Sequence, residues 1–252
     1  MLIPGLVSVT FRQKTRAEIA QLMQKAALPA IEWGGDVHIP ADKYDSDEFE
    51  DALTEAAYLC SSGKIYTASF GSYYRCDRHD EVNSAITLSL DAPNIRVWAG
   101  NKNSEDASDE DRRNTVSFIR ELCEELAPHG VTVSTEFHGG TLTNEYHSAL
   151  SLIEEVGCEN FRTYWQPNQF RDEEYNVAAL KSVLPYLSSV HVFTWDAHAR
   201  YSLADGEKKW RNYIDIIESF GGDHHMLMEF VKDDSEEQFL RDAEVLNRWL
   251  GR

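Results

Sequence analysis

The sequence lacks long hydrophobic runs and closely spaced cysteines. No apolar stretch approaches the roughly 20 residues needed to cross a bilayer, so no membrane association is expected. The four cysteines (Cys60, Cys76, Cys123 and Cys158) include no CxxC pair, which argues against a zinc ribbon or a thioredoxin-type motif. We expect reduced cysteines, at least two of them in the core. The N-terminus has no basic region and no signal-peptide cleavage pattern, which predicts a cytoplasmic protein.

Positive charge is also scarce. The chain carries 24 Lys and Arg against 43 Asp and Glu, a formal net charge of −19. Proteins that bind nucleic acid rely on clustered Lys and Arg, so nucleic acid is not an expected partner. The 42% apolar and 27% charged residues are typical of a globular protein that buries a core.

Strand-like and helix-like segments alternate along the whole chain. Eight units with no linker between them favour a closed (β/α)8 TIM barrel, an α/β fold with one domain over residues 1–252. Strands are expected at residues 6–11, 30–33, 64–69, 95–99, 131–138, 161–165, 190–195 and 226–231. Helices are expected near residues 15–27, 46–60, 81–90, 110–126, 144–156, 173–184, 208–220 and 235–250, the fifth capped by Thr143 or Asn144.

The stretch VTVSTEFHGGTLT, residues 131–143, carries ionisable groups to the end of the fifth strand. Side chains alternate along a strand, so Glu136 and His138 lie on one face. Functional groups of a TIM barrel gather at the carboxyl ends of its strands. This strand end is therefore expected at the active site.

Four consecutive strands each end in a polar side chain of the kind that binds metals: Glu136, Gln166, His191 and Glu229. Two carboxylates, one imidazole and one amide oxygen form a mixed set suited to Mn, Mg, Co or Zn. A divalent cation would offset the cost of burying two carboxylates together. The pattern predicts one divalent metal ion.

Each of these side chains also has a simpler interpretation. A glutamate near a strand end can form a structural ion pair, for which Arg12, Arg96 and Lys232 are available. His191 alone is consistent with a buried core histidine. Only the joint pattern on neighbouring strands favours a metal site.

The same stretches resemble the xylose isomerase-like TIM barrel superfamily, in particular its sugar phosphate isomerase/epimerase group. The resemblance covers essentially the whole chain and is specific for the fold and for the place of the site. It is carried by LVSVTFR, AIEWGGDVHIP, FGSYYR, IRVWAG, STEFHGGTLT, HVFTWD and MLMEF.

The resemblance implies that Glu136, Gln166, His191 and Glu229 hold the metal, by analogy with Glu, Asp, His and Glu in the epimerases and dehydratases. This chain departs from the pattern at Gln166, where relatives carry Asp, and at Gln169, which matches a family histidine. A neutral amide brings no charge, so weaker metal binding is expected.

The implied function is a metal-dependent isomerase or epimerase of a small sugar, keto-sugar or polyol-derived ketone. Glu136 and Glu229 would act as an acid/base pair on opposite faces of one carbon, with a metal-stabilised enediolate between the two proton transfers. Arg200 would bind a substrate oxygen or phosphate. The other expected substrate-binding residues are His38, Tyr73, Trp98, His138 and Gln169.

Other functions fit the same sequence. A lyase or dehydratase acting on a keto-sugar or a dehydroshikimate-like compound would use the same site and expel a β-hydroxyl group. A non-catalytic sugar-binding barrel is compatible with Gln166. An endonuclease IV-like enzyme is disfavoured by Ser69 and Gln169, at positions where extra metal ligands would be expected, and by the acidic surface. The resemblance also allows a homo-oligomer.

Overall fold

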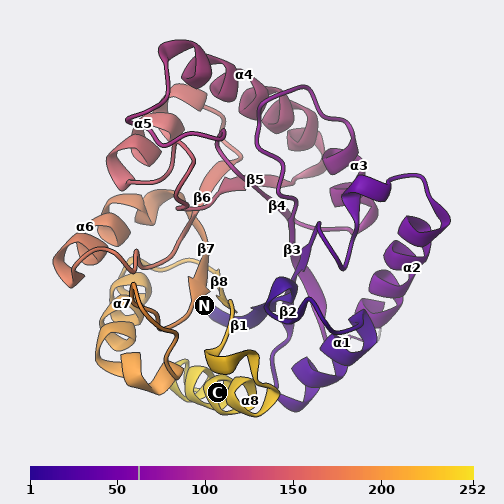
Figure 1. Cartoon of the computed structure of the whole chain (residues 1–252), viewed down its shortest axis with the longest axis vertical. Helices are drawn as coiled ribbons and strands as arrows, with labels where there is room; N and C mark the ends of the chain where they lie inside the picture. The colour runs from indigo at the N-terminus through magenta and orange to yellow at the C-terminus, as the bar shows by residue number, and fades with distance from the viewer. Residues whose placement is uncertain (62) are drawn as a thin grey trace.

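The computed structural model describes residues 1–61 and 63–252 and forms a closed barrel of parallel strands inside a ring of helices (Figure 1). Each strand pairs with the next, and β1 pairs with β8 to close the barrel. The prediction of a (β/α)8 barrel is confirmed. The strands are β1 Leu2–Val7, β2 Ala30–Gly34, β3 Tyr66–Gly71, β4 Asn94–Val97, β5 Thr132–Thr135, β6 Phe161–Trp165, β7 Leu187–Val192 and β8 His224–Met228.

The helices cover the outside of the barrel and bury their apolar faces against it. Among the described residues, no helix is both long and apolar enough to cross a membrane. All four cysteines are free, and Cys76 and Cys123 are buried as expected. The helices are α1 Arg16–Lys25, α2 Asp47–Ser61, α3 Val82–Ser89, α4 Asp109–Leu126, α5 Tyr146–Val156, α6 Glu173–Val183, α7 Glu207–Phe220 and α8 Glu236–Trp249.

Local sequence signals set several helix starts. The Thr15 hydroxyl accepts from the Glu18 amide, and the Glu18 carboxylate accepts from the Thr15 amide, which forms the expected capping box of α1. The Ser235 hydroxyl accepts from the Gln238 amide at the start of α8. These contacts satisfy backbone donors that have no partner within the helix.

The first strand lies earlier than predicted. It spans Leu2–Val7, whereas Ser8–Phe11 forms a 3-10 helix. The pairing with β8 begins at Leu2 and fixes this register. Gly5 permits the close approach of both neighbouring strands, because a Cβ atom there would lie 2.4 Å from the Ala30 carbonyl oxygen of β2 and 2.6 Å from Leu227 Cδ2 of β8.

Other strand ends also differ from the prediction, because pairing with the neighbouring strands determines where each strand starts and stops. β3 is shifted toward the C-terminus, while β7 and β8 start earlier, and β5 stops at Thr135. Glu136 and Glu229 therefore lie one position beyond their strands. The helix after β5 is capped by Glu145 and not by Thr143 or Asn144, because the Thr143 hydroxyl donates to the Glu136 carbonyl oxygen.

Candidate active site

A cavity of about 450 Å³ lies at the end of the barrel where the carboxyl ends of the strands meet. It is lined by residues from the segments after six strands, β3 to β8, by Arg96 of β4, and by residues of the segment that follows β1. This is the end of a TIM barrel at which active sites are built. The lining residues are Val9, Arg12, Tyr73, Arg96, Trp98, Glu136, Phe137, His138, Gly139, Asn144, Gln166, Pro167, Asn168, Gln169, Phe170, Trp195, Glu229 and Phe230.

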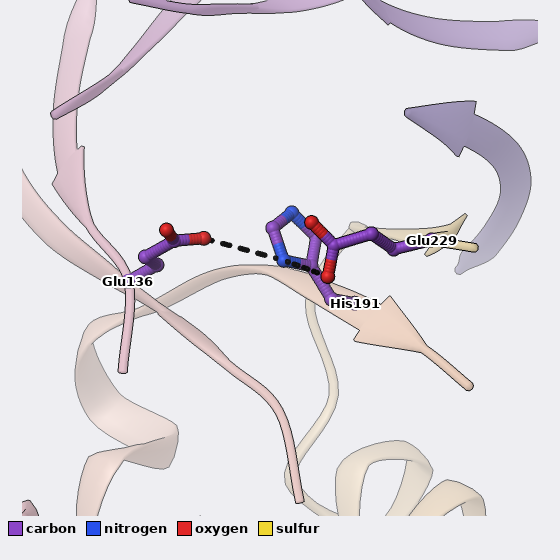
Figure 2. Close-up of side chains that lie close together, drawn as sticks. All are labelled: Glu136, His191 and Glu229. Carbon is purple, nitrogen blue, oxygen red and sulfur yellow. Dashed lines mark ion pairs between the residues drawn. The ribbon is translucent and has the colours of Figure 1, made fainter. Parts of the chain in front are cut away.

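Three oxygen atoms converge on Nδ1 of the buried His191 ring. Glu136 Oε2 lies 3.4 Å away and Glu229 Oε2 lies 3.5 Å away, one on each side of the imidazole in Figure 2. Gln166 Oε1 lies 2.8 Å from the same nitrogen. The four residues predicted from consecutive strand ends are therefore brought together by the fold.

The hydrogen bonds of Gln166 define the tautomer of His191. The Gln166 amide nitrogen donates to the Phe137 carbonyl oxygen at 2.8 Å, so its Oε1 is an acceptor. His191 Nδ1 must then carry the proton. The opposite nitrogen, Nε2, is buried without a hydrogen-bond partner among the described residues and lies 3.9 Å from Glu32 Oε1.

Glu136 is surrounded by donors. Arg96 Nη1 lies 3.0 Å from Glu136 Oε1, and the Trp98 indole nitrogen donates to the same oxygen at 2.5 Å. The Glu136 side chain is 4% exposed. A buried carboxylate with two such donors has its negative charge stabilised where it lies.

Arg96 is itself held by a second buried carboxylate. Its Nε donates to Glu32 Oε1 at 2.8 Å, and Tyr164 donates to the other Glu32 oxygen at 2.8 Å. Burial lowers the pKa of Arg96, but Glu136 and Glu32 outweigh that effect, so its pKa lies well above the ordinary value. Gly71 leaves room for the pair, because a Cβ atom there would lie 2.7 Å from both Arg96 Nη2 and Glu32 Oε1.

The second site carboxyl group, Glu229, has a different environment. Burial, reinforced by the negative charge of Glu136, raises the pKa of Glu229 to about 8. Burial lowers the pKa of His191 to about 3, so its imidazole is neutral at neutral pH. Burial therefore keeps a proton on Glu229 at neutral pH, whereas Glu136 is contacted by the donors of Arg96 and Trp98.

The geometry fits one divalent cation. Atoms that bind the same ion at about 2.0–2.2 Å lie roughly 3 Å apart when they are neighbours, close to the spacing around His191 Nδ1. Reachable ligand atoms of Glu136, His191 and Glu229 lie within 4.8 Å of one another. If Glu229 loses its proton, the carboxylates of Glu32, Glu136 and Glu229 carry three negative charges, and Arg96 offsets one of them. A divalent cation neutralises the remaining two. Gln166 Oε1 supplies a fourth, neutral oxygen.

The cavity wall includes four of the six residues predicted to bind substrate: Tyr73, Trp98, His138 and Gln169. The His138 ring stacks on Trp98 with 4.4 Å between centroids, and Tyr73 meets Trp98 edge-on.

The other two lie outside the lining. His38 is buried and contacts the Lys14 carbonyl oxygen through Nε2. Arg200 donates to Asp234 and lies over the Phe230 ring, 4.7 Å from its centroid.

Glu32 is the main residue that sequence reasoning missed. It lies in the middle of β2 and is fully buried. A carboxylate inside a short apolar strand is a signal in itself, because such a group needs a buried partner. Arg96 inside β4 is the matching signal, and the sequence indicated it only as one available ion-pair partner.

One curated relative matches a short segment of the chain. It is a 3-dehydroshikimate dehydratase of Bacillus anthracis, 41% identical over 68 residues. That match spans 27% of this chain and 24% of the length of the relative.

Solved structures match over nearly the full length at low identity. The probable 3-DHS dehydratase AsbF of Bacillus anthracis has a TM-score of 0.78 at 19% identity, covering 98% of this chain and 99% of that one. A D-allulose 3-epimerase from Methylomonas sp. in complex with D-allulose has a TM-score of 0.71 at 14% identity, covering 99% and 95%. The IOLI protein with a bound zinc atom has a TM-score of 0.71 at 13% identity, covering 99% and 98%.

A family model described as the xylose isomerase-like TIM barrel matches residues 9–249. Its match covers nearly the whole barrel, including His191 and the three residues around its Nδ1 atom. The resemblance seen in the sequence is confirmed: the chain belongs to the xylose isomerase-like TIM barrel family.

Proposed function

We propose that this chain is an enzyme that removes a proton from the carbon next to the carbonyl group of a small hydroxylated ketone. One observation carries the proposal: the carboxyl groups of Glu136 and Glu229 flank the same imidazole, at the base of a cavity. Two carboxyl groups that share one site can remove a proton from a substrate and deliver a proton to it.

Glu136 acts as the base in this proposal, because Arg96 and Trp98 contact and orient its carboxylate. Glu229 loses its own proton when it binds the metal, so the proton that is delivered later in the reaction is the one that Glu136 has removed. Removal of the substrate proton moves the electron pair of the C–H bond toward the carbonyl oxygen. The buried site excludes water and strengthens the electrostatic contacts around that oxygen.

A divalent ion (Mn, Mg, Co or Zn), when bound by Glu136, Gln166, His191 and Glu229, would supply the positive charge that stabilises the developing negative oxygen. Gln166 also binds the His191 Nδ1 proton in the absence of metal. Metal binding must displace that hydrogen bond, which supports the expectation of weaker binding than in a site with a fourth carboxylate.

We propose a lyase as the first outcome, with a hydroxylated cyclic keto acid such as 3-dehydroshikimate as substrate. After proton removal, the C–O bond at the β carbon breaks, and the hydroxyl group leaves as water with the proton that Glu136 has removed. The dehydratase of Bacillus anthracis, 41% identical over its matched segment, and the AsbF structure with a TM-score of 0.78 support this choice.

An isomerase or epimerase of a small sugar is the second candidate. The placement of Glu136 and Glu229 on two sides of His191 supports it, because one group could remove a proton and the other return one to the opposite face. The fold shared with a D-allulose 3-epimerase agrees with a carbohydrate ligand.

The test is to incubate the protein in D2O with Mn²⁺, Co²⁺, Mg²⁺ or Zn²⁺ and either 3-dehydroshikimate or D-allulose. A lyase gives a product that has lost one water molecule. An epimerase gives an isomer of unchanged composition with one deuterium at the inverted carbon.

Glu136→Gln is the matched control, since it keeps the size of the side chain and removes the base. It should abolish both deuterium uptake and product formation. Thermal stabilisation by either ligand without exchange or product would contradict the proposal and support a sugar-binding barrel.

A further inference from the structure

Only two cationic side chains line the cavity within the described part of the chain: Arg96 and Arg12. Arg96 is buried and lies between the carboxylates of Glu32 and Glu136, which outweigh its charge. Arg12 is different, since its side chain is 43% exposed and reaches the cavity from the segment after β1. The chain has a net charge of −19, so a partly exposed guanidinium at the cavity is a distinctive feature that a negatively charged ligand group would explain.

Among the described residues, the Arg12 guanidinium is held at Nε and keeps one N–H group without a partner on each of its Nη atoms. Its Nε donates to Asp36 Oδ2 at 2.6 Å, and Nη2 donates to the Tyr73 hydroxyl at 2.9 Å. Nη1 has only a long contact of 3.5 Å with the Val9 carbonyl oxygen. Three of the five N–H groups of Arg12 thus have a partner among the described residues, and two are available.

Two strained residues support this guanidinium. Tyr73 has a φ of 56° and Phe230 has a φ of 52°, in the left-handed region that large side chains rarely adopt. Tyr73 bonds Arg12 through its hydroxyl, and the Phe230 ring lies 5.8 Å from the Arg12 guanidinium carbon. Both line the cavity, and strain of this kind persists where the surrounding structure enforces it for function.

Tyr73 also connects the two arginines. Its ring lies 5.7 Å from the Arg96 guanidinium carbon, and its hydroxyl accepts from Arg12. Burial raises the pKa of Tyr73 to about 12, so the hydroxyl keeps its proton. Because the oxygen already accepts from Arg12, this proton is available for an acceptor in the cavity.

We propose that Arg12 and Tyr73 form a subsite for a carboxylate group of the substrate. The two available N–H groups of Arg12 match the two oxygens of a carboxylate, and the Tyr73 proton adds a third donor. Asp36 neutralises only the Nε side and orients these two groups. The inference rests on the proposed function, because the same cavity must hold the reacting ketone.

The subsite separates two substrate classes that share the first chemical step. A neutral ketose has no group that requires a guanidinium, whereas a keto acid gains a charge-assisted hydrogen bond. The structure therefore assigns this cavity to hydroxylated keto acids.

The test is calorimetric binding of 3-dehydroshikimate and of its carboxamide, with Mn²⁺ present, to wild type, Arg12→Gln, Arg12→Lys and Tyr73→Phe. The two ligands have the same shape and differ in charge. Wild type should bind the acid at least about tenfold more tightly than the amide. Arg12→Gln should bind both equally, with unchanged amide affinity and metal content. Arg12→Lys should keep part of the preference, and Tyr73→Phe should reduce it a few-fold.

Arg241→Gln is the matched control, because this exposed arginine pairs with Glu237 on α8, away from the cavity. It should behave as wild type. Equal binding of acid and amide by wild type, no binding of the acid, or an unchanged preference in Arg12→Gln would overturn the subsite. If the acid binds with the predicted preference and is not converted, the subsite stands and the dehydratase proposal fails. If the acid is converted and Arg12→Gln keeps the preference, the reverse holds.

Discussion

The two halves of the barrel contribute opposite charges to the cavity. The first half, β1–β4 and the segments that follow them, supplies its two cations, Arg12 and Arg96, with Tyr73 and Trp98 beside them. The second half, β5–β8 and their loops, supplies its two lining carboxylates, Glu136 and Glu229, together with Gln166. His191 lies beneath, on β7.

In our proposal, the two halves bind different parts of one substrate complex. The second half is arranged for a cation, with oxygen atoms around one nitrogen. The first half is arranged for negative charge, both that of Glu136 and, in our proposal, that of the substrate. The Arg96 to Glu136 pair is the point where the two halves meet.

The largest effect is expected on metal binding, when a ligand residue of the second half is replaced. His191→Ala and Glu229→Gln should each weaken Mn²⁺ binding by at least about 100-fold, because each removes a ligand atom from the site. Elemental analysis of purified protein and calorimetric titration would measure the loss. Arg12→Gln, in the first half, should keep the metal stoichiometry of wild type. A variant at His191 that retains full metal content would refute the site.

Gly71→Ala should disturb the buried ion pair of the first half, which joins Arg96 and Glu32. A Cβ atom 2.7 Å from Arg96 Nη2 and Glu32 Oε1 must displace one of them. The expected cost is about 1–3 kcal/mol of unfolding free energy, measured by urea denaturation. Gly139→Ala is the control, because a Cβ atom there meets nothing within 4 Å, and its unfolding free energy should stay within about 0.5 kcal/mol of wild type. Equal stability of the two variants would show that the pair does not need this space.

Protein stability and Mn²⁺ affinity should both depend on pH through Glu229. The pKa of Glu229 is raised from 4.5 to about 8 in the folded metal-free chain. Between these pH values the folded state holds a proton that the unfolded state has released, so the contribution of Glu229 to stability falls as pH rises. The same proton must leave when metal binds, so Mn²⁺ affinity should rise up to about tenfold per pH unit in that window.

Unfolding and titration series from pH 5 to pH 8 on wild type and Glu229→Gln would test this dependence. The difference in unfolding free energy between the two proteins should change across the series. A constant difference would mean that Glu229 titrates as an ordinary carboxyl group.

Trp98→Phe is the mildest change. It removes the indole donor to Glu136 and keeps an aromatic ring against His138. Loss of one hydrogen bond of about 1 kcal/mol should lower kcat/KM roughly three- to tenfold. Metal content should stay constant, which steady-state kinetics and elemental analysis would show together. An unchanged kcat/KM would mean that Arg96 alone orients Glu136.

Much of the fold could be predicted, because its signals are local. Alternating strand and helix segments, with caps at Thr15 and Ser235, repeat along the chain, and eight such units with no linker favour a closed barrel. The exact strand ends could not be predicted. They depend on register with neighbours, as in β1, which starts at Leu2 because it pairs with β8.

The candidate site likewise contains residues that the sequence predicted and contacts that it did not. Glu136, Gln166, His191 and Glu229 stood out because each follows or ends a strand, and the barrel brings consecutive strand ends together. The Arg96 to Glu32 pair joins residues 64 positions apart, and no local pattern relates them. The same applies to the N–H groups of Arg12 that Asp36 and Tyr73 leave available.

The sequence by itself determined the barrel, its family and the four ligand-type residues, because periodicity and strand-end position are encoded within short segments. The tertiary structure alone decided which nitrogen of His191 faces the oxygens and which carboxyl group retains a proton. It also decided which arginine is free to meet a substrate. These properties depend on burial and on distances of a few ångströms between side chains from different strands, which exist only after the barrel has closed.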